Sequence, residues 1–177
     1  MRDSSLSACT QAVLAAEVGH PPLALDYAAE AALIDLQDLE HSARDGLHIA
    51  SLAGTWIALV NGFGGMRDHV GVQSFAPRLP DGLTSLSFSI VRCKLCFRVE
   101  VTARAATYRL TEGTGTLLII HHAEPLTLND SDPIELPIPA SLSRESPAQR
   151  HGREPRRREP GGAPGNAGRR YLIEPKE

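Results

Sequence analysis

The sequence predicts an α+β protein in which helices come first, a small antiparallel β-sandwich follows, and a disordered tail ends the chain. Over roughly the first 65 residues the apolar positions recur at helical spacing. Beyond them apolar and polar residues alternate, with glycine and proline turns at regular intervals, which is typical of a sandwich. From residue 143 onward, arginine, proline and glycine dominate. Such a segment buries too little apolar surface to offset its ordering entropy.

The first two helices are predicted over residues 4–18 and from Pro22 to about Leu39. The polar residues 3–7 offer several N-cap candidates for the first helix. Gly19-His20-Pro21-Pro22 ends it, and Pro22 suits the first position of the next helix. The second helix carries a broad apolar face rich in alanine.

A third helix is predicted after the turn Asp45-Gly46, ending at Gly62 or at the Gly64-Gly65 pair. Its apolar residues have the spacing of one buried stripe, namely Ile49, Ala53, Trp56, Ile57 and Val60. His48 then lies at the helix N-terminus, beside backbone N–H groups that have no intrahelical partner and attract anions.

The sandwich strands are predicted from alternation. Leu86, Phe88 and Ile90 alternate with serines in a strand that starts near Thr84, and residues 95–101 repeat the pattern. Further short strands are expected at residues 70–75, 106–110, 116–121 and 125–128.

Composition limits the class of protein. No apolar run reaches membrane-spanning length. The three cysteines Cys9, Cys93 and Cys96 do not indicate a secreted disulfide scaffold, so a reducing cytoplasm is expected. From Arg144 onward the net charge is +4, against −7 for residues 1–143. Acidic residues, proline and glycine surround the arginine clusters, so we expect a solvated tail rather than a nucleic-acid or membrane partner.

Two other patterns are interpreted as structural. Cys93-Lys94-Leu95-Cys96 has the form of a zinc or redox motif, but it has no second cysteine pair and falls where two strands should meet in a hairpin. His121 and His122 are adjacent in a predicted strand, so their rings should point to opposite faces and not share a metal ion. No metal site is predicted.

The helical part alone is too small to bury much surface, because a piece of this size hides only about 60% of its unfolded surface. Trp56, Ile57 and the alanine-rich second helix are therefore expected to face neighbours that this chain does not contain.

Several ordered motifs resemble the C-terminal portion of glycoside hydrolase family 65, over roughly residues 2–140. The family contains inverting phosphorylases of maltose, kojibiose and trehalose, and some acid trehalases that use water. The motifs that carry the resemblance are Arg2-Asp3-Ser4-Ser5-Leu6-Ser7, Ala24-Leu25-Asp26-Tyr27, Asp35-Leu36, Asp45-Gly46-Leu47-His48-Ile49-Ala50-Ser51, Gly62-Phe63-Gly64-Gly65-Met66-Arg67-Asp68-His69 and Phe75-Ala76-Pro77-Arg78-Leu79-Pro80.

The resemblance implies three parts. Residues 1–66 would be the last helices of an (α/α)6 catalytic barrel, residues 67–142 a jelly-roll-like C-terminal sandwich domain, and residues 143–177 the disordered tail. The expected substrates of the intact enzyme are an α-linked disaccharide and inorganic phosphate, with no cofactor. The sequence leaves open which disaccharide is used, and it favours phosphate over water as the nucleophile.

The resemblance also assigns a phosphate site. Its residues here would be Ser4, Ser5 and His48, with Gly46 and Leu47 as backbone donors. Two helix N-termini, two hydroxyls and an imidazole suit an oxyanion. Arg2 could add a positive charge, whereas Asp3 opposes an anion unless it pairs with Arg2 or caps the helix; both roles stay open.

The catalytic glutamic acid of the family lies in a segment that this chain does not contain, so no catalytic residue is named. We expect the isolated chain to be inactive, because loss of a general acid alone typically costs about 10²- to 10⁴-fold in rate. A second hypothesis makes the chain a non-catalytic sandwich module that docks onto a separately encoded catalytic chain.

Overall fold

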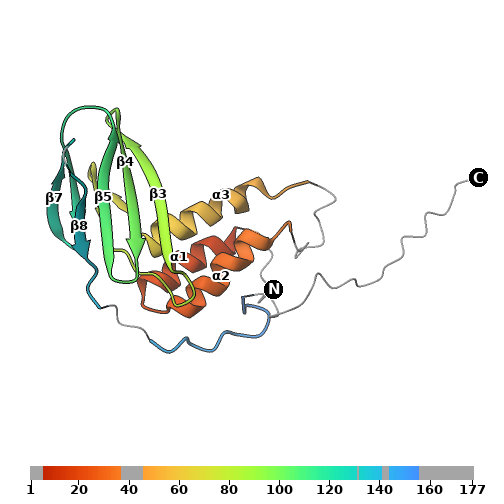
Figure 1. Ribbon diagram of the computed structural model, residues 1–177. Coiled ribbons are helices and arrows are strands. Elements are labelled where there is room, and N and C mark those ends of the chain that lie inside the picture. The colour runs from red at the N-terminus through yellow and green to blue at the C-terminus, as the bar shows by residue number, and fades with distance from the viewer. Residues whose placement is uncertain (1–5, 37–45, 131, 141–143, 156–177) are drawn as a thin grey trace, which may run out of the picture.

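The computed structural model describes residues 6–36, 46–130, 132–140 and 144–155, and it confirms the α+β class (Figure 1). The helices form one layer, which lies beside a sandwich of two sheets. In chain order the helices are α1 (Ser7–Glu17), α2 (Pro21–Leu33), α3 (Ile49–Ile57) and the π-helix η2 (Ala58–Phe63), which continues α3. None of the helices in the described ranges has the length and apolar character needed to cross a membrane.

Helices α1 and α2 pack through alanines. Their buried contacts come mainly from Ala8, Ala12, Ala15 and Ala16 on α1 and Ala24, Ala28 and Ala31 on α2. The alanine-rich face of α2 is therefore covered within this chain, and the expectation that it faces missing neighbours is wrong. Helix α2 is also shorter than predicted: it ends at Leu33, residues 34–36 form a turn, and residues 37–45 lie outside the described part.

Helix α3 packs with its small residues inward. Ser51, Gly54 and Ala58 are buried, whereas Ile49, Trp56 and Ile57 are exposed. A Cβ added at Gly54 would lie 2.6 Å from the Sγ of Cys9, so α3 approaches α1 too closely for a larger side chain. The predicted buried stripe is thus wrong except at Val60, which reaches the sandwich core. Trp56 and Ile57 were expected to face neighbours that this chain does not contain, and both are exposed here.

The sandwich consists of two four-stranded sheets, in the orders β1-β2-β6-β7 and β3-β4-β5-β8. Strands β2 and β6 pair in parallel, and the other pairs are antiparallel. Two of the strands were not predicted, because β1 is wholly polar and β8 is a short run between prolines. The strands are β1 (Arg67–His69), β2 (Val72–Phe75), β3 (Ser85–Arg92), β4 (Leu95–Thr102), β5 (Ala105–Glu112), β6 (Leu117–His121), β7 (Glu124–Leu128) and β8 (Ile134–Pro137).

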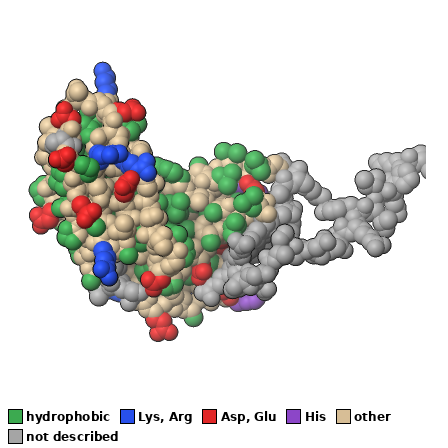
Figure 2. Space-filling view, viewed as in Figure 1, with side chains coloured by type: hydrophobic (Ala, Val, Ile, Leu, Met, Phe, Trp, Pro, Cys, Tyr) green, Lys and Arg blue, Asp and Glu red, His purple; other side chains and the backbone are tan. Residues whose placement is uncertain are grey.

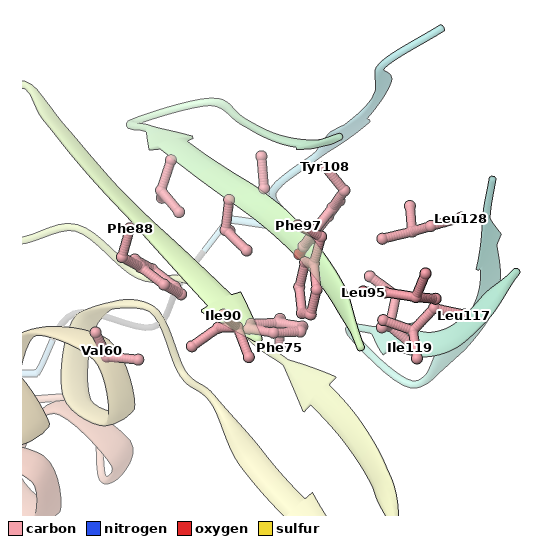
Figure 3. Close-up of a cluster of buried hydrophobic side chains, with 13 residues drawn as sticks. Val60, Phe75, Phe88, Ile90, Leu95, Phe97, Tyr108, Leu117, Ile119 and Leu128 are labelled. Carbon is pink, nitrogen blue, oxygen red and sulfur yellow. The ribbon is translucent and has the colours of Figure 1, made fainter. Parts of the chain in front are cut away.

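Large side chains from both sheets close the sandwich core (Figure 3). Phe75 lies at its centre, with ring centroids 6.0 Å from Phe97 in a T-shaped arrangement and 5.5 Å from Tyr108. Phe97 and Tyr108 are fully buried. Val60 of η2 joins this cluster, so the helical layer and the sandwich share apolar contacts.

The structure places the Cys93-Lys94-Leu95-Cys96 motif in the β3–β4 hairpin. Cys93 and Lys94 have φ of 51° and 66°, as the two central residues of a tight hairpin turn require. Cys96 lies within β4, opposite Val91. This arrangement supports the interpretation of the motif as turn and strand residues.

The geometric argument for His121 and His122 is wrong, because the two rings touch. Their centroids are 4.7 Å apart, since His122 leaves the strand with φ of 45°. Both ring nitrogens of His121 are nevertheless engaged: Nδ1 lies 2.8 Å from the Tyr108 hydroxyl, and Nε2 lies 3.1 Å from the Pro137 carbonyl oxygen. These contacts tie β6 of one sheet to β5 and β8 of the other.

The described start of the predicted disordered tail contacts the helices. The Arg144 amide donates to the Gly19 carbonyl at 2.8 Å, and the Tyr27 hydroxyl contacts Gln149 Oε1 at 3.2 Å and the Arg153 carbonyl at 3.1 Å. The prediction therefore needs correction for residues 144–155, which have defined partners on α2 and on the turn before it. The rest of the predicted tail, residues 156–177, lies outside the described part.

Candidate functional site

His48 is the N-cap residue of α3, as predicted. Its carbonyl oxygen accepts hydrogen bonds from the amides of Ser51 and Leu52 at 2.8 and 3.0 Å. Gly46, two residues earlier, has φ of +133°, a conformation that other residues rarely adopt. Gly46 thus allows the turn that delivers His48 to the start of the helix.

Asp35 holds His48 in place through two contacts. Its Oδ1 lies 2.5 Å from Nδ1 of the His48 ring, and its Oδ2 accepts a hydrogen bond from the His48 backbone amide at 2.9 Å. The Asp35 side chain is 7% exposed and that of His48 is 24% exposed. A carboxylate at the end of α2 therefore fixes both the backbone and the ring at the start of α3.

The contacts also favour the ionised form of Asp35. The hydrogen bond from the His48 ring, with its backbone hydrogen bond and its charge, holds the pKa of Asp35 below the ordinary value. The ionised carboxylate can only accept, so Nδ1 of His48 carries hydrogen and donates it. Nε2 is then the ring nitrogen that Asp35 does not hold.

The first turn of α3 also offers a backbone donor. The Ile49 amide donates to the Leu47 carbonyl at 2.9 Å, whereas the Ala50 amide makes no hydrogen bond within the described residues. It is one of the N-terminal amides that a helix leaves without an internal acceptor. Sequence reasoning named Gly46 and Leu47 as backbone donors and missed Ala50.

Ser4 and Ser5, the other predicted phosphate ligands, lie outside the described residues. The structure thus brings together Gly46 and His48, and adds Asp35, which was not predicted as a site residue. The available signal was an acidic residue in the apolar run Leu33-Ile34-Asp35-Leu36. Such a residue needs a partner when it is buried.

A separate cavity of about 330 Å³ lies between the end of α1 and the sandwich, and it includes none of the predicted site residues. The Arg78 guanidinium beside it donates to the carbonyls of Ala16 and Glu17 at 3.2 Å and so caps α1. Burial lowers the pKa of His122 at the same cavity, and the nearby His121 and Arg78 charges act in the same direction. We interpret this region as the structural junction between the helices and the sandwich.

Family models identify the two parts of the chain. The model of the glycosyl hydrolase family 65 central catalytic domain matches residues 1–57, and the model of the family 65 C-terminal domain matches residues 66–128. The chain belongs to glycoside hydrolase family 65. The candidate site lies in the part that matches the catalytic domain, and the sandwich is the part that matches the C-terminal domain.

Relatives of this family 65 chain are much longer than it is. A glycosyl hydrolase of Mycobacterium leprae is 54% identical over 159 residues, which cover 88% of this chain and 20% of that protein. The α,α-trehalose phosphorylase of Thermoanaerobacter brockii is 41% identical over 63% of this chain and 14% of its own length. The matched part of this chain therefore spans 20% and 14% of the lengths of these two relatives.

A solved structure supports the fold. A putative kojibiose phosphorylase from the human microbiome superimposes with a TM-score of 0.73 at 23% identity, covering 80% of this chain and 20% of that protein. The arrangement of helices and sandwich is thus the arrangement found in part of that longer chain.

Proposed function

We propose that this chain provides the phosphate-binding wall of a family 65 enzyme that cleaves an α-linked disaccharide by inverting phosphorolysis. The observation that carries the proposal is the Asp35–His48 pair at the start of α3. It holds the imidazole at the helix start that also carries the Ala50 amide, which makes no hydrogen bond within the described residues. Helix geometry favours an anion at such a place. Gly46 shapes the turn, and Ser4 and Ser5 would add hydroxyl donors.

In this reaction a phosphate oxygen forms a bond to the anomeric carbon while the glycosidic carbon–oxygen bond breaks. The leaving oxygen takes a proton from a glutamic acid of the catalytic domain, outside the part of that domain represented here. His48 binds phosphate through Nε2–H, which requires the protonated imidazole because Nδ1–H is already donated to Asp35. The carboxylate orients the ring and balances its charge, while the Ala50 amide orients a phosphate oxygen.

The relatives support phosphorolysis as the reaction class, since proteins similar to this chain are named trehalose, maltose and kojibiose phosphorylases. We propose that the chain alone has no turnover, because it supplies no general acid. The three cysteines are free thiols, which supports a reducing cytoplasm as the site of action.

The test uses a hybrid enzyme in which this chain replaces the matching segment of the Thermoanaerobacter trehalose phosphorylase. Wild-type hybrid should release glucose 1-phosphate from trehalose in a phosphate-dependent reaction. His48→Ala should raise the KM for phosphate about 10- to 100-fold, the range expected for a lost hydrogen bond to a charged group. Leu118→Ala, on an exposed strand position, should leave the KM for phosphate unchanged.

An unchanged KM for phosphate in the His48→Ala hybrid would contradict the assignment. Free glucose as the only product of an active hybrid would indicate hydrolysis instead. Turnover of maltose, kojibiose or trehalose by the isolated chain would contradict the proposed inactivity.

A second candidate function is that of a non-catalytic module that docks onto a separately encoded catalytic chain. The observation that favours it is the exposed apolar side of α3.

A further inference from the structure

The cavity of about 330 Å³ at the junction of helices and sandwich has room for a small organic ligand. One wall is the end of α1 with the turn after it, and the other is the segment after β2 with the turn after β6. Pro139, Ala140 and Arg144 complete the lining. The volume falls in the range of small-molecule pockets, about 300–1,000 Å³, which occur preferentially at domain interfaces.

The basic groups at this cavity do not come from the helices. Residues 6–36 and 46–66, which include the described helices, contain no Lys or Arg. On the face drawn in Figure 2, the Lys and Arg side chains lie over the sandwich half of the molecule. Arg78, after β2, and Arg144, after the sandwich, line the cavity, and Glu17 of α1 is the acidic residue among the lining residues.

The sum of the charges is positive. Arg67 pairs with the Glu17 carboxylate at 2.9 Å and offsets its charge. The end of α1 adds about −0.5 elementary charge, so both lining arginines leave a net of about +1.5. His122 adds none at neutral pH, because burial holds its pKa below the ordinary value of 6.5. A phosphate monoester carries about −1.5 to −2 charges at pH 7 and complements this sum, whereas a neutral sugar does not.

Arg78 keeps donors for such an anion. Its Nε donates to the Ala76 carbonyl, and its Nη1 donates to the carbonyls of Ala16 and Glu17. Its Nη2 makes no hydrogen bond with the described residues and retains its N–H groups. Backbone contacts thus hold the guanidinium in one orientation, which suits the directional binding of a phosphate group.

His122 supplies an acceptor for a hydroxyl group. Its ring makes a hydrogen bond with the backbone of Pro77, and proline has no backbone N–H, so the ring donates to the carbonyl. A neutral imidazole carries one N–H, which leaves the other nitrogen as an acceptor. That nitrogen is Nε2, which is buried and has no hydrogen-bond partner within the described residues. Because an unsatisfied buried acceptor is costly, a ligand hydroxyl that reaches it is favoured.

We propose that this cavity binds a phosphate monoester of a small hydroxylated molecule, such as a hexose phosphate. Arg78 and Arg144 contact the phosphate group, His122 accepts a hydrogen bond from a hydroxyl, and the proline and alanine walls pack against C–H groups. The proposal rests on the proposed function only for the choice of glucose 1-phosphate as the probe. The ligand contacts both the part that matches the catalytic domain and the part that matches the C-terminal domain.

The test is isothermal titration calorimetry of the full chain with glucose 1-phosphate, inorganic phosphate and glucose. Glucose 1-phosphate should bind at least about tenfold more tightly than either of the others, as expected when both the phosphate and the hydroxyls contribute. The same titrations are made with His48→Ala, which should bind the ester at the cavity as the wild type does. Nitrogen-15 NMR of the histidine rings should show a shift of the His122 Nε2 resonance on binding.

Matched substitutions locate the ligand. Arg78→Lys keeps the charge but loses the planar fork and should weaken binding at least about tenfold. Arg144→Ala should weaken it about two- to fivefold, as for an exposed ion pair. This variant retains the contacts of residue 144 with Gly19 and His20, which its backbone makes. Arg150→Ala removes the same charge from the same segment away from the cavity lining and should bind like the wild type. Circular dichroism establishes that each variant keeps its helix and strand content.

Each outcome decides the proposal. Absence of binding, binding that Arg78→Lys and Arg144→Ala leave unchanged, or an unmoved His122 resonance would overturn it. Inorganic phosphate that binds as tightly as glucose 1-phosphate would overturn the ester as the ligand. Binding lost only in His48→Ala would assign the ester to the proposed phosphate wall and not to the cavity. Cavity binding that persists while the His48→Ala hybrid keeps its KM for phosphate would support this inference and contradict the proposed function.

Discussion

The sandwich and the helical layer bury opposite kinds of residues. The sandwich encloses Phe75, Phe97 and Tyr108 between its own two sheets. The helical layer encloses alanines, Ser51 and Gly54, and leaves its larger apolar side chains on α3 outside. The difference shows that the sandwich completes its core within this chain, whereas the helical layer leaves large apolar side chains of α3 uncovered. Hydrophobic residues in a helix therefore do not always mark the side that faces its nearest neighbours.

The largest expected effect contrasts Phe97 with Ile49. Phe97→Ala should lower the free energy of unfolding by about 3–5 kcal/mol, because it leaves a cavity in a closed core. Ile49→Ala, at an exposed position of α3, should change it by about 0.5 kcal/mol or less. Urea denaturation followed by circular dichroism measures both values. Similar losses for the two variants would break the contrast between the regions.

The close approach of α3 to α1 can be tested at two glycines. Gly54→Val should destabilise the chain by about 1–3 kcal/mol, because even a Cβ there meets Cys9 Sγ at 2.6 Å. Gly62→Ala serves as the control, since its Cβ would have ordinary contacts, the nearest being 3.5 Å from the Val13 Cα. Thermal unfolding that ranks the two variants the other way would contradict small-residue packing in the helical layer.

Removal of one tyrosine hydroxyl from the sandwich and one from the helical layer gives a further comparison of the two regions. Tyr108→Phe removes the partner of buried His121 Nδ1 and should cost about 1–3 kcal/mol. Tyr27→Phe, which loses contacts to Gln149 and Arg153 at the helical surface, should cost about 0.5–1.5 kcal/mol. Chemical denaturation at neutral pH gives both values, and a greater loss at Tyr27 would reverse the comparison.

The burial of Tyr108 also predicts that the stability of the fold depends on pH. Burial raises its pKa in the folded protein well above the ordinary value of 10.0. Above pH 10 the unfolded chain then binds fewer protons at this group than the folded chain, so stability falls as the pH rises. Below pH 10 the contribution is fully present. Denaturation at pH 9 and pH 11 should show a smaller loss in Tyr108→Phe than in the wild type.

The smallest expected effect is a change in the pKa of Asp35, whose contacts with His48 connect the end of α2 to the start of α3. The pKa of Asp35 should be lower than its ordinary value of 3.8 and should move toward that value in His48→Ala. The backbone contact from residue 48 remains, so the return should be partial. Carbon-13 NMR titration of the carboxyl group measures the change. As the pH falls through the lowered pKa, the stabilisation from the ionised Asp35 is lost.

The sequence allowed much of the sandwich to be predicted, because strand alternation reports which side chains enter a core made by the same chain. Six of the strands were expected near their observed positions, including those that carry Phe88 and Phe97. Polar β1 and proline-flanked β8 were not predicted, because they form through pairing with β2 and β5 and their own sequences show no strand alternation. The prediction of which side of α3 is buried was wrong for a related reason. Helical periodicity identifies an apolar stripe but does not show whether a neighbour in this chain covers it.

The candidate site shows the same limit. His48 and Gly46 were recognisable from a local turn and helix start, and the structure places both there. Asp35 was not predicted as a site residue, because its partner is thirteen residues away across a segment with no regular pattern. Only the packing of α2 beside α3 brings the carboxylate to the ring.

The continuity of α3 and η2 has a mechanical consequence. Residues 49–63 form one unbroken helical rod, which at about 1.5 Å per residue is roughly 20 Å long. His48 stands at its first end, and Val60 is anchored among the sandwich side chains near the other. The sandwich therefore holds one end of a helical segment whose other end follows His48. Side-chain packing in the sandwich core thereby constrains where the imidazole lies, although the two are far apart in the sequence.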